Sequence, residues 1–329
     1  MKKLRCILTI AVVIVSLSAP AFAWGDKGHK TVGQVAQLYL DAMTRQKLAQ
    51  IMKQGDTLAN MSIWADQVKR RRFGANANDP DEDTQAFLRD MRNKDNRDWH
   101  FVDLPLDCQS YSACPQFQDK FDVVHVIDNC IVVLQGGTNF PNLNKRNALR
   151  MLVHLIGDMH QPLHVGVGFI NEDENSNSII IETDPAVIIA RHLRGDSDIG
   201  GNKLLLSRES GNNLHSFWDG DLVYGASGGK SVAQFASELK NTATPAPVSW
   251  NGTDNNPRKW AQEWALDSLK ISKRNTYNTV QIVRPVVVEE EQKYLIKVGA
   301  DYSSNNTRIV QGQLAKGGYR LAQLLKAIL

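Results

Sequence analysis

The chain is organised around MLVHLIGDMHQPLHV, residues 151–165. Apolar residues recur through this stretch at helical spacing, which predicts a helix packed in the interior of the protein. His154 and Asp158 are four residues apart and therefore lie on one face of that helix. Pro162 ends the helix, because proline lacks the backbone N–H that a further turn needs, and His164 follows just beyond it. The stretch thus predicts a helix that carries histidine and aspartate side chains, which can bind a metal, in apolar surroundings.

The same spacing recurs in NNLHSFWDGD, residues 212–221, where His215 and Asp219 are also four residues apart. Three more residues of these types lie beside apolar segments: His29, Asp66 and His100. Any one of them could be a core residue hydrogen-bonded to a neighbour. Burying all of them is costly unless something compensates their polarity, and imidazole together with carboxylate suits zinc. We therefore predict a multinuclear zinc site.

The other three histidines are predicted not to bind metal. His125 lies in an apolar helical stretch and is expected in the core. His160 follows Asp158 by two residues and so points away from the face that Asp158 occupies. His192 lies in an irregular segment.

Helical periodicity dominates the rest of the chain and predicts a mainly α fold without internal repeats or a clear linker. Helices are expected at 29–40, at 44–52 with Thr44 as the cap, and at 123–135, 144–159, 231–242 and 314–329. Strands are expected at 178–183, 203–207 and 283–289. The stretch 70–85 is predicted to be a loop, and the polar segment 166–199, with its apolar middle, to form a hairpin or a short helix.

The first 23 residues have the three parts of a secretory signal peptide. Lys2, Lys3 and Arg5 precede an apolar run, and AFA at 21–23 fits the cleavage rule, so Trp24 is the expected first residue of the exported protein. No later stretch reaches the roughly 18 apolar residues of a membrane span. We expect a soluble protein that is periplasmic or secreted.

Charge and cysteine content agree with an exported protein that has a local site. The chain has 38 basic and 35 acidic residues, and the three surplus positive charges lie in the predicted signal peptide. The exported protein is therefore near neutral, and its net charge does not favour nucleic acid. Cys108, Cys114 and Cys130 permit one disulfide and one thiol in an oxidising compartment, with the pairing open.

Whole motifs of the chain resemble those of the zinc-dependent single-strand-specific nucleases of fungi, plants and bacteria, which share a fold with zinc phospholipase C. The matching blocks occur in the family's order: WGDKGH (24–29), WAD (64–66), WHFVD (99–103), LVHLIGDMHQPLH (152–164), GGNK (200–203), NLHSFWD (213–219) and AKGGYRLA (315–322). The resemblance implies one mainly α domain over 24–329 with an insertion at about 166–199. It also implies an endonuclease that cleaves single-stranded DNA and RNA to products with 5′-phosphates, with 3′-nucleotidase activity as a further expectation.

The resemblance further implies three zinc ions per chain. Asp66, His100, His154 and Asp158 would hold one; Trp24, through its α-amine and carbonyl, would hold a second with His29 and Asp158; His164, His215 and Asp219 would hold the third. Signal cleavage would then create a ligand, because it frees an α-amine whose pKa of about 8 lets a metal displace its proton. By the same resemblance, catalysis is assigned to Asp66, Lys69 and Asp158.

Four residues would bind substrate if the resemblance holds. Lys69 would contact the phosphate, Phe101 would stack on a base, Asp103 would hydrogen-bond the base edge, and Asn202 would line the site. A stacking platform favours unpaired strands, whose bases can leave the stack. The insertion directly follows His164 and is expected at the rim of the cleft, where it would affect substrate range. We expect single-stranded nucleic acid and nucleotides as partners, and a monomeric protein.

Two other functions fit part of this pattern. Zinc phospholipase C has a similar trinuclear site and also begins with tryptophan, but the spacing of Phe101 and Asp103 and the GGYRLA block favour a nuclease. A periplasmic zinc-binding or storage protein would show closed metal coordination, whereas an enzyme needs an open position. Hydrolysis of single-stranded DNA, as opposed to a choline phospholipid, separates the first two.

Overall fold

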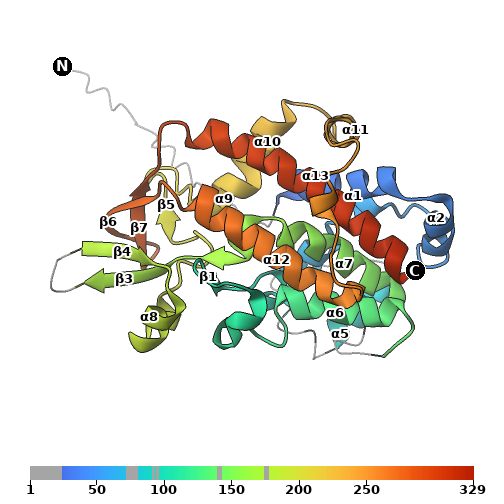
Figure 1. Ribbon diagram of the computed structural model, residues 1–329, viewed down its shortest axis with the longest axis horizontal. Coiled ribbons are helices and arrows are strands. Elements are labelled where there is room, and N and C mark those ends of the chain that lie inside the picture. The colour runs from blue at the N-terminus through green and yellow to red at the C-terminus, as the bar shows by residue number, and fades with distance from the viewer. Residues whose placement is uncertain (1–23, 72–80, 91–92, 94–95, 139–142, 174–177) are drawn as a thin grey trace, which may run out of the picture.

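The structure is a computed structural model that describes residues 24–71, 81–90, 93, 96–138, 143–173 and 178–329. The predicted signal peptide and residues 72–80, the greater part of the predicted loop at 70–85, lie outside the described residues. Helices make up most of what is described, and the strands are short and few (Figure 1). The predicted mainly α fold is confirmed.

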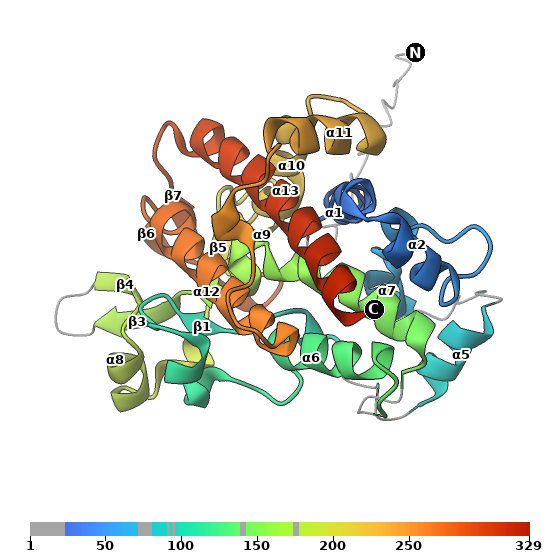
Figure 2. The same ribbon diagram turned by 45° about the vertical axis from the view of Figure 1, so that its right-hand side comes forward.

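The centre of the fold is α7 (Lys145–Met159), which carries His154 and Asp158. Its residues from 146 to 159 are all buried, and a helix buried on every side needs neighbours all round it. Those neighbours are α1 (Asp26–Tyr39), α3 (Leu58–Met61), α4 (Trp64–Arg71), α5 (Glu82–Arg89), α6 (Val123–Leu134), α12 (Trp260–Ile271) and α13 (Tyr302–Ile328). Figures 1 and 2 both show α6 and α13 alongside α7.

The long helix α13 closes one side of the fold by packing closely on α1. A Cβ atom added to Gly318 would lie 2.4 Å from the Cβ of Val35, so this contact requires glycine. The helix predicted at 314–329 is the second half of α13, and its apolar face is buried. Two further helices, α10 (Leu222–Ser227) and α11 (Val232–Thr242), pack against the same helix.

The cap predicted for the second helix was wrong. α2 (Ala42–Ala49) starts two residues before Thr44, and Asp41 precedes it as the cap. The Asp41 carboxylate accepts a hydrogen bond from the backbone N–H of Thr44 at 2.8 Å. Aspartate and threonine are both good caps, and here the earlier one takes the N–H donor of the first turn.

Short strands lie together at one end of the molecule (Figure 1). β1 (Leu104–Pro105) pairs in parallel with β2 (Gly166–Val167); β3 (Phe169–Asp173) pairs antiparallel with β4 (Ser178–Glu182); β7 (Glu291–Lys297) pairs in parallel with β5 (Leu204–Leu205) and antiparallel with β6 (Gln281–Val288). Each predicted strand segment overlaps one of them: 178–183 overlaps β4, 203–207 overlaps β5 and 283–289 overlaps β6. The segment 166–199 forms both of its expected alternatives, the β3–β4 hairpin and the short helix α8 (Pro185–Ala190).

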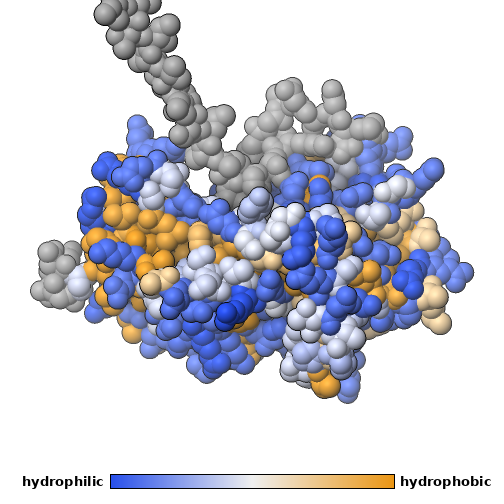
Figure 3. Space-filling view, turned by 90° about the horizontal axis from the view of Figure 1, so that it is seen from above, coloured by the Kyte–Doolittle hydropathy of each residue, from blue (hydrophilic) through white to orange (hydrophobic). Residues whose placement is uncertain are grey.

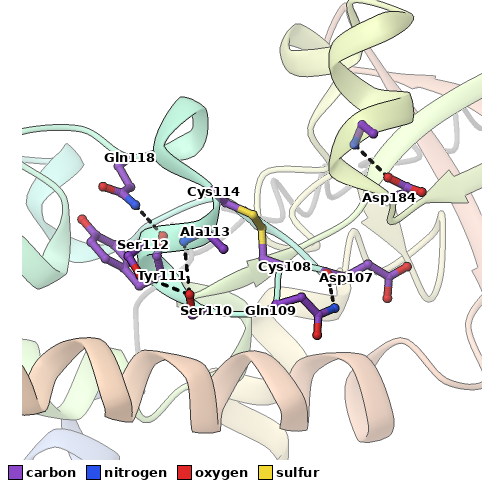
Figure 4. The surroundings of a disulfide bond; sticks show 11 residues. Asp107, Cys108, Gln109, Ser110, Tyr111, Ser112, Ala113, Cys114, Gln118 and Asp184 are labelled. Atoms are coloured by element: carbon purple, nitrogen blue, oxygen red, sulfur yellow. Dashed lines mark hydrogen bonds between the residues drawn. A yellow bond between two sulfur atoms is a disulfide. The ribbon is translucent and has the colours of Figure 1, made fainter.

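The predicted disulfide joins Cys108 to Cys114, and Cys130 is a buried free thiol. Figure 4 shows the bond closing the loop that contains Tyr111. Burial raises the pKa of the Cys130 thiol, which keeps it in the unreactive protonated form. The sequence left this pairing open because it depends on how the chain turns between the two cysteines, where the 3-10 turn Tyr111–Ala113 lies.

On one face of the molecule, part of the apolar surface lies near the hairpins (Figure 3). Figure 3 shows apolar side chains gathered toward the side of the molecule where the strands lie. Ile180 on β4 and Val283 and Val287 on β6 are among the exposed residues there. Within the described ranges, no helix has both the length and the apolar character needed to cross a membrane.

Candidate metal centre

α7 places the first group of polar side chains in the interior. His154 and Asp158 lie one turn apart on it, with His154 Nε2 3.1 Å from Asp158 Oδ2. His100, from the 3-10 turn Asp98–His100, brings Nδ1 to 2.9 Å from the same oxygen. Asp66, near the start of α4, lies with Oδ1 3.9 Å from His154 Nε2. Four residues from three distant segments of the chain thus meet at one point, as the sequence predicted.

His29 forms a second group on the other side of Asp158. It lies in the first turn of α1, and its Nε2 atom is 3.4 Å from Asp158 Oδ1. The approach depends on Gly157, because a Cβ atom there would lie 2.7 Å from His29 Nδ1. The two carboxylate oxygens of Asp158 therefore face different histidines, with Oδ1 toward His29 and Oδ2 toward His100 and His154.

The third group consists of His164, His215 and Asp219. His164 lies in the 3-10 turn after α7, and His215 lies on α9 (Leu214–Ser216). His215 Nε2 is 3.1 Å from Asp219 Oδ2, and the two histidine rings are 5.0 Å apart. Asp219 lies in a π-helical turn, Phe217–Asp221, and not in a regular α-helix. Such turns are frequent at functional sites.

Backbone carbonyls fix the orientation of three of these imidazoles. The Nδ1 atoms of His154, His164 and His215 lie 2.6, 2.8 and 2.7 Å from the carbonyl oxygens of Ser62, His100 and Gly200. A carbonyl only accepts, so each Nδ1 must carry the proton and donate it. Each neutral ring then has its lone pair on Nε2. This is the arrangement that orients a histidine as a metal ligand.

The buried polar atoms of the three groups test whether a metal fits. Seven of these atoms have no hydrogen-bond partner among the residues that the structure describes: His29 Nδ1 and Nε2, Asp66 Oδ1 (which has an ion pair with Lys69), His100 Nε2, Asp158 Oδ1, His164 Nε2 and Asp219 Oδ2. A buried polar atom without a partner is costly. Candidate ligand atoms lie within 4.8 Å of one another in each of three sets: His29, His154 and Asp158; Asp66, His100 and His154; and His164, His215 and Asp219. Nitrogen and carboxylate oxygen are the donors that zinc prefers, so the residues present fit zinc.

Burial keeps three of the histidines neutral. It lowers the pKa of His29, that of His100 to about 3 and that of His164 to about 4. The charged form of each ring is disfavoured because it would lose its hydration. At neutral pH these rings therefore have a free lone pair, which is the form that binds a metal.

The carboxylates behave in the opposite way. Burial alone would favour their neutral forms, but His154 holds the pKa of Asp66 and of Asp158 well below the usual range. Against the same burial, Asp158 raises the pKa of His154, and Asp219 raises that of His215. Ionised carboxylates are metal ligands, and a proton held on either histidine is one that a metal would have to displace.

The predicted substrate-binding residues surround these groups. Lys69 Nζ is 2.8 Å from Asp66 Oδ1, so its ammonium lies at the first group. Phe101 follows His100 and is half-buried. Asp103 accepts a hydrogen bond from Ser197 Oγ at 3.4 Å, and burial raises its pKa to about 6. The predicted insertion therefore does reach this region, through Ser197.

The insertion is also part of the core. Phe169, Ile170 and Ile188 belong to it, and all three are buried. Its hairpin and α8 are therefore anchored to the rest of the fold, and only its outer parts could form a rim.

A loop at the end of the insertion, residues 198–202, holds His215 in place through Gly200 O, and no sequence motif alone predicted this role. Asp198 is buried and accepts hydrogen bonds from the Tyr277 hydroxyl at 2.7 Å and from Gly201 N at 3.0 Å. Burial raises the pKa of Asp198 to about 7. The same loop carries Asn202, whose side chain donates to Ile199 O at 2.8 Å. The paired glycines of GGNK were the available signal, since Gly200 and Gly201 both have positive φ.

The three histidines predicted not to bind metal lie outside the three groups. The prediction that His125 belongs to the core was wrong: its side chain is 43% exposed and contacts Asp122. The reason is that His125 lies on the outer face of α6, the face of the partly buried Asp128 and Asn129, while Val124 and Val126 on either side of it are buried. His160 is buried with Nδ1 2.7 Å from Ile156 O, turned away from Asp158 as expected, and His192 is exposed.

Comparison with known proteins gives one family. The sequence model of the S1/P1 nuclease family matches residues 24–329. Nuclease S1 of Aspergillus oryzae is 26% identical, over 98% of this chain and 97% of its own length. Nuclease P1 of Penicillium citrinum is 26% identical over 93% and 97% of the two chains, and Endonuclease 3 of Arabidopsis thaliana is 24% identical over 99% and 95%.

Proposed function

Because this chain belongs to the S1/P1 nuclease family, whose members hydrolyse phosphodiester bonds, we propose that it is a zinc-dependent endonuclease of single-stranded DNA and RNA. Its products would carry 5′-phosphates. The observation that carries the proposal is the set of buried imidazole and carboxylate atoms without hydrogen-bond partners on both sides of Asp158.

Nine residues would hold three zinc ions. The first ion would be held by Asp66, His100, His154 and Asp158, the second by Trp24, His29 and Asp158, and the third by His164, His215 and Asp219. Zinc at these groups would supply Lewis-acid polarisation of the phosphate and lower the pKa of water to about 7. The position of Asp158 between the first two groups supports its assignment as their shared ligand.

Trp24 would bind through its backbone once the signal peptide is removed. Its side chain is fully buried, and the next residue, Gly25, donates its N–H to Asp219 O at 3.0 Å. The start of the exported chain is therefore tied to the segment that carries a ligand of the third group. This proposal requires an exported protein, and we propose one folded domain over 24–329 that acts as a monomer.

Lys69 would bind the phosphate. Its ammonium pairs with Asp66 and is partly exposed, so it can contact a phosphate oxygen while Asp66 keeps it beside the first metal group. A cation placed here would stabilise the negative charge that develops on the phosphate oxygens during hydrolysis.

Phe101, Asp103 and Asn202 would bind the base. The half-buried ring of Phe101 lies two residues before Asp103, whose carboxylate would accept hydrogen bonds from the edge of a base stacked on the ring. A base inside a duplex cannot reach such a platform, which is why we propose a preference for single strands. A 3′-nucleotide offers the same base and phosphate, so 3′-nucleotidase activity would follow from the same contacts. The carboxyl group beside the ring favours a base over a lipid.

The experiment that tests this proposal is a digestion of matched single-stranded and duplex oligonucleotides by the signal-cleaved protein. We expect zinc-dependent cleavage of the single strand, loss of activity with a chelator, and products that a ligase accepts because they carry 5′-phosphates. Asp128→Asn is a suitable control, since Asp128 pairs with Arg258 at the surface and should leave the rate unchanged. Hydrolysis of a choline phospholipid in place of DNA would overturn the proposal.

A further inference from the structure

Gln161 is a fully buried amide whose two ends are both bonded. Its Nε2 atom donates to Asp219 Oδ1 at 2.7 Å. Its Oε1 atom accepts from the backbone N–H of Leu163 at 2.6 Å. A side chain that spans two segments of the metal centre in this way is more than a filler of the core.

The backbone of Gln161 connects further parts of the same centre. Its N–H donates to the carbonyl oxygen of Asp158 at 2.8 Å, and its carbonyl accepts from the N–H of His164 at 3.0 Å. The backbone of Gln161 is thus hydrogen-bonded to two proposed zinc ligands, Asp158 and His164. Its side chain is hydrogen-bonded to the carboxylate of a third, Asp219.

The two carboxylate oxygens of Asp219 therefore differ in their hydrogen bonding. Oδ1 is occupied by the Gln161 amide, which can only donate through Nε2. Oδ2 is 3.1 Å from His215 Nε2 and has no hydrogen-bond partner in the described part of the chain. Asp219 lies in the π-helical turn Phe217–Asp221, and Gln161 holds its carboxylate from outside that turn.

We propose that Gln161 is a positioning residue for the third metal: it turns Asp219 so that Oδ2 faces His215 and His164, and it ties the turn that carries His164. This inference rests on the proposed function, because it takes the third group as a zinc site. Hydrogen-bond partners of this kind typically change metal affinity about 10–100-fold when they are removed.

Two substitutions distinguish the roles of the two side-chain hydrogen bonds of Gln161. Gln161→Met keeps the length of the side chain but removes both bonds. Gln161→Glu keeps an acceptor for Leu163 N but replaces the donor with a charge that repels Asp219. If Asp219 is the residue positioned, both variants should weaken the third site, whereas a role in the turn alone would spare the glutamate variant.

A matched control is available in the same region. Gln313 on α13 is buried and donates from Nε2 to His160 O at 2.9 Å, but this bond ends on the backbone of a residue outside the metal groups. Gln313→Met should therefore destabilise the fold, as the loss of a buried amide hydrogen bond does, without a specific effect on any metal. Urea unfolding of all variants would measure that shared structural effect.

The experiment measures zinc release from the signal-cleaved, zinc-loaded protein against chelators of graded strength. We expect three zinc ions in the wild type, one of which is released about 10–100-fold more readily in both Gln161 variants, with the other two unchanged. Gln313→Met should release zinc like the wild type. The inference is overturned if the Gln161 variants keep all zinc at wild-type affinity, or lose all of it in parallel with Gln313→Met.

Asp219→Asn, run beside them, distinguishes this inference from the function on which it rests. If it weakens one zinc while the Gln161 variants do not, only the role of Gln161 is wrong. If it leaves the zinc content and affinity unchanged, the third metal site itself is refuted, and the inference falls with it.

Discussion

The ring of His29 lies flat on the ring of His154, with centroids 3.9 Å apart and planes inclined by 14°. Two stacked imidazoles cannot both carry a positive charge at this distance without strong repulsion. The proposed ligand sets assign the two rings to different zinc ions, and Asp158 contacts both rings. The stack therefore marks the boundary between the first two groups, and Asp158 is the residue that joins them.

Asp158→Asn should abolish most of the activity and lower the zinc content of the protein. An amide is a poor ligand, and the substitution affects both groups that Asp158 contacts. We expect a loss of activity greater than the roughly 10–100-fold that a change outside the ligand shell costs. Zinc per chain, measured beside the hydrolysis rate on single-stranded DNA, checks this. Full zinc content with a normal rate would refute the shared role.

Residues left in front of Trp24 should remove one zinc. An uncleaved signal peptide, or a tag fused directly to Trp24, converts the α-amine into an amide, and an amide nitrogen is a poor zinc ligand at neutral pH. Trp24 is fully buried, so an added chain must also find space beside the centre. We expect about one zinc fewer per chain and much slower hydrolysis than in the correctly cleaved protein. Equal metal content and equal rates would exclude the amine.

Gly200→Ala should disturb the third group through a steric clash. A Cβ atom there would lie 2.5 Å from Leu163 O and 3.3 Å from His215 Nδ1, at a φ of +57°. We expect a loss of roughly 2–4 kcal/mol in the free energy of unfolding and weaker binding of one zinc. Denaturant unfolding and zinc release measure the two effects.

Gly211→Ala is the matched control for that clash. Gly211 also has a positive φ, of +65°, but a Cβ atom there would meet nothing within 4 Å in the parts of the chain that are described. It should cost only about 1 kcal/mol for the left-handed backbone and leave zinc binding intact. Similar losses of zinc affinity in both variants would contradict the role given to Gly200.

Asp103 should make base preference depend on pH. Burial raises its pKa to about 6, so its carboxylate accepts hydrogen bonds above pH 6 and is protonated below it. Cytosine offers an N–H donor where thymine offers a carbonyl acceptor. We expect the ratio of kcat/KM for a deoxycytidine dinucleotide to that for a thymidine dinucleotide to rise at least about fivefold between pH 5 and 7.5.

Asp103→Asn serves as the control for that measurement, because its ratio should not change with pH. Using a ratio of two substrates cancels any effect of pH on the metal centre. The sign for stability follows from the same pKa: since it is raised on folding, the contribution of Asp103 to the free energy of unfolding is present at low pH and lost as pH rises through 6. A wild-type ratio that stays constant would contradict contact between Asp103 and the base.

The sequence by itself determined the features that depend on local spacing. His154 and Asp158 share a face because four residues make one helical turn. Pro162 prevents that helix from continuing, whatever the rest of the fold, because proline lacks the backbone N–H of a further turn. The predominance of helices followed from the same periodicity, whereas only β4, β5 and most of β6 fell within the predicted strand segments. Two local details were wrong: Asp41 displaced Thr44 as a cap, and His125 fell on the outer face of an apolar helix.

Only the tertiary structure decided which distant residues meet. His29, Asp66 and His100 reach α7 from separate segments, and their approach depends on packing such as the contact between His29 and Gly157. The bond from Gln161 to Asp219 and that from Ser197 to Asp103 join residues 58 and 94 positions apart, and no sequence pattern announces them. Spacing along a helix is set by the geometry of the backbone, whereas contacts between segments are set by how the whole core packs.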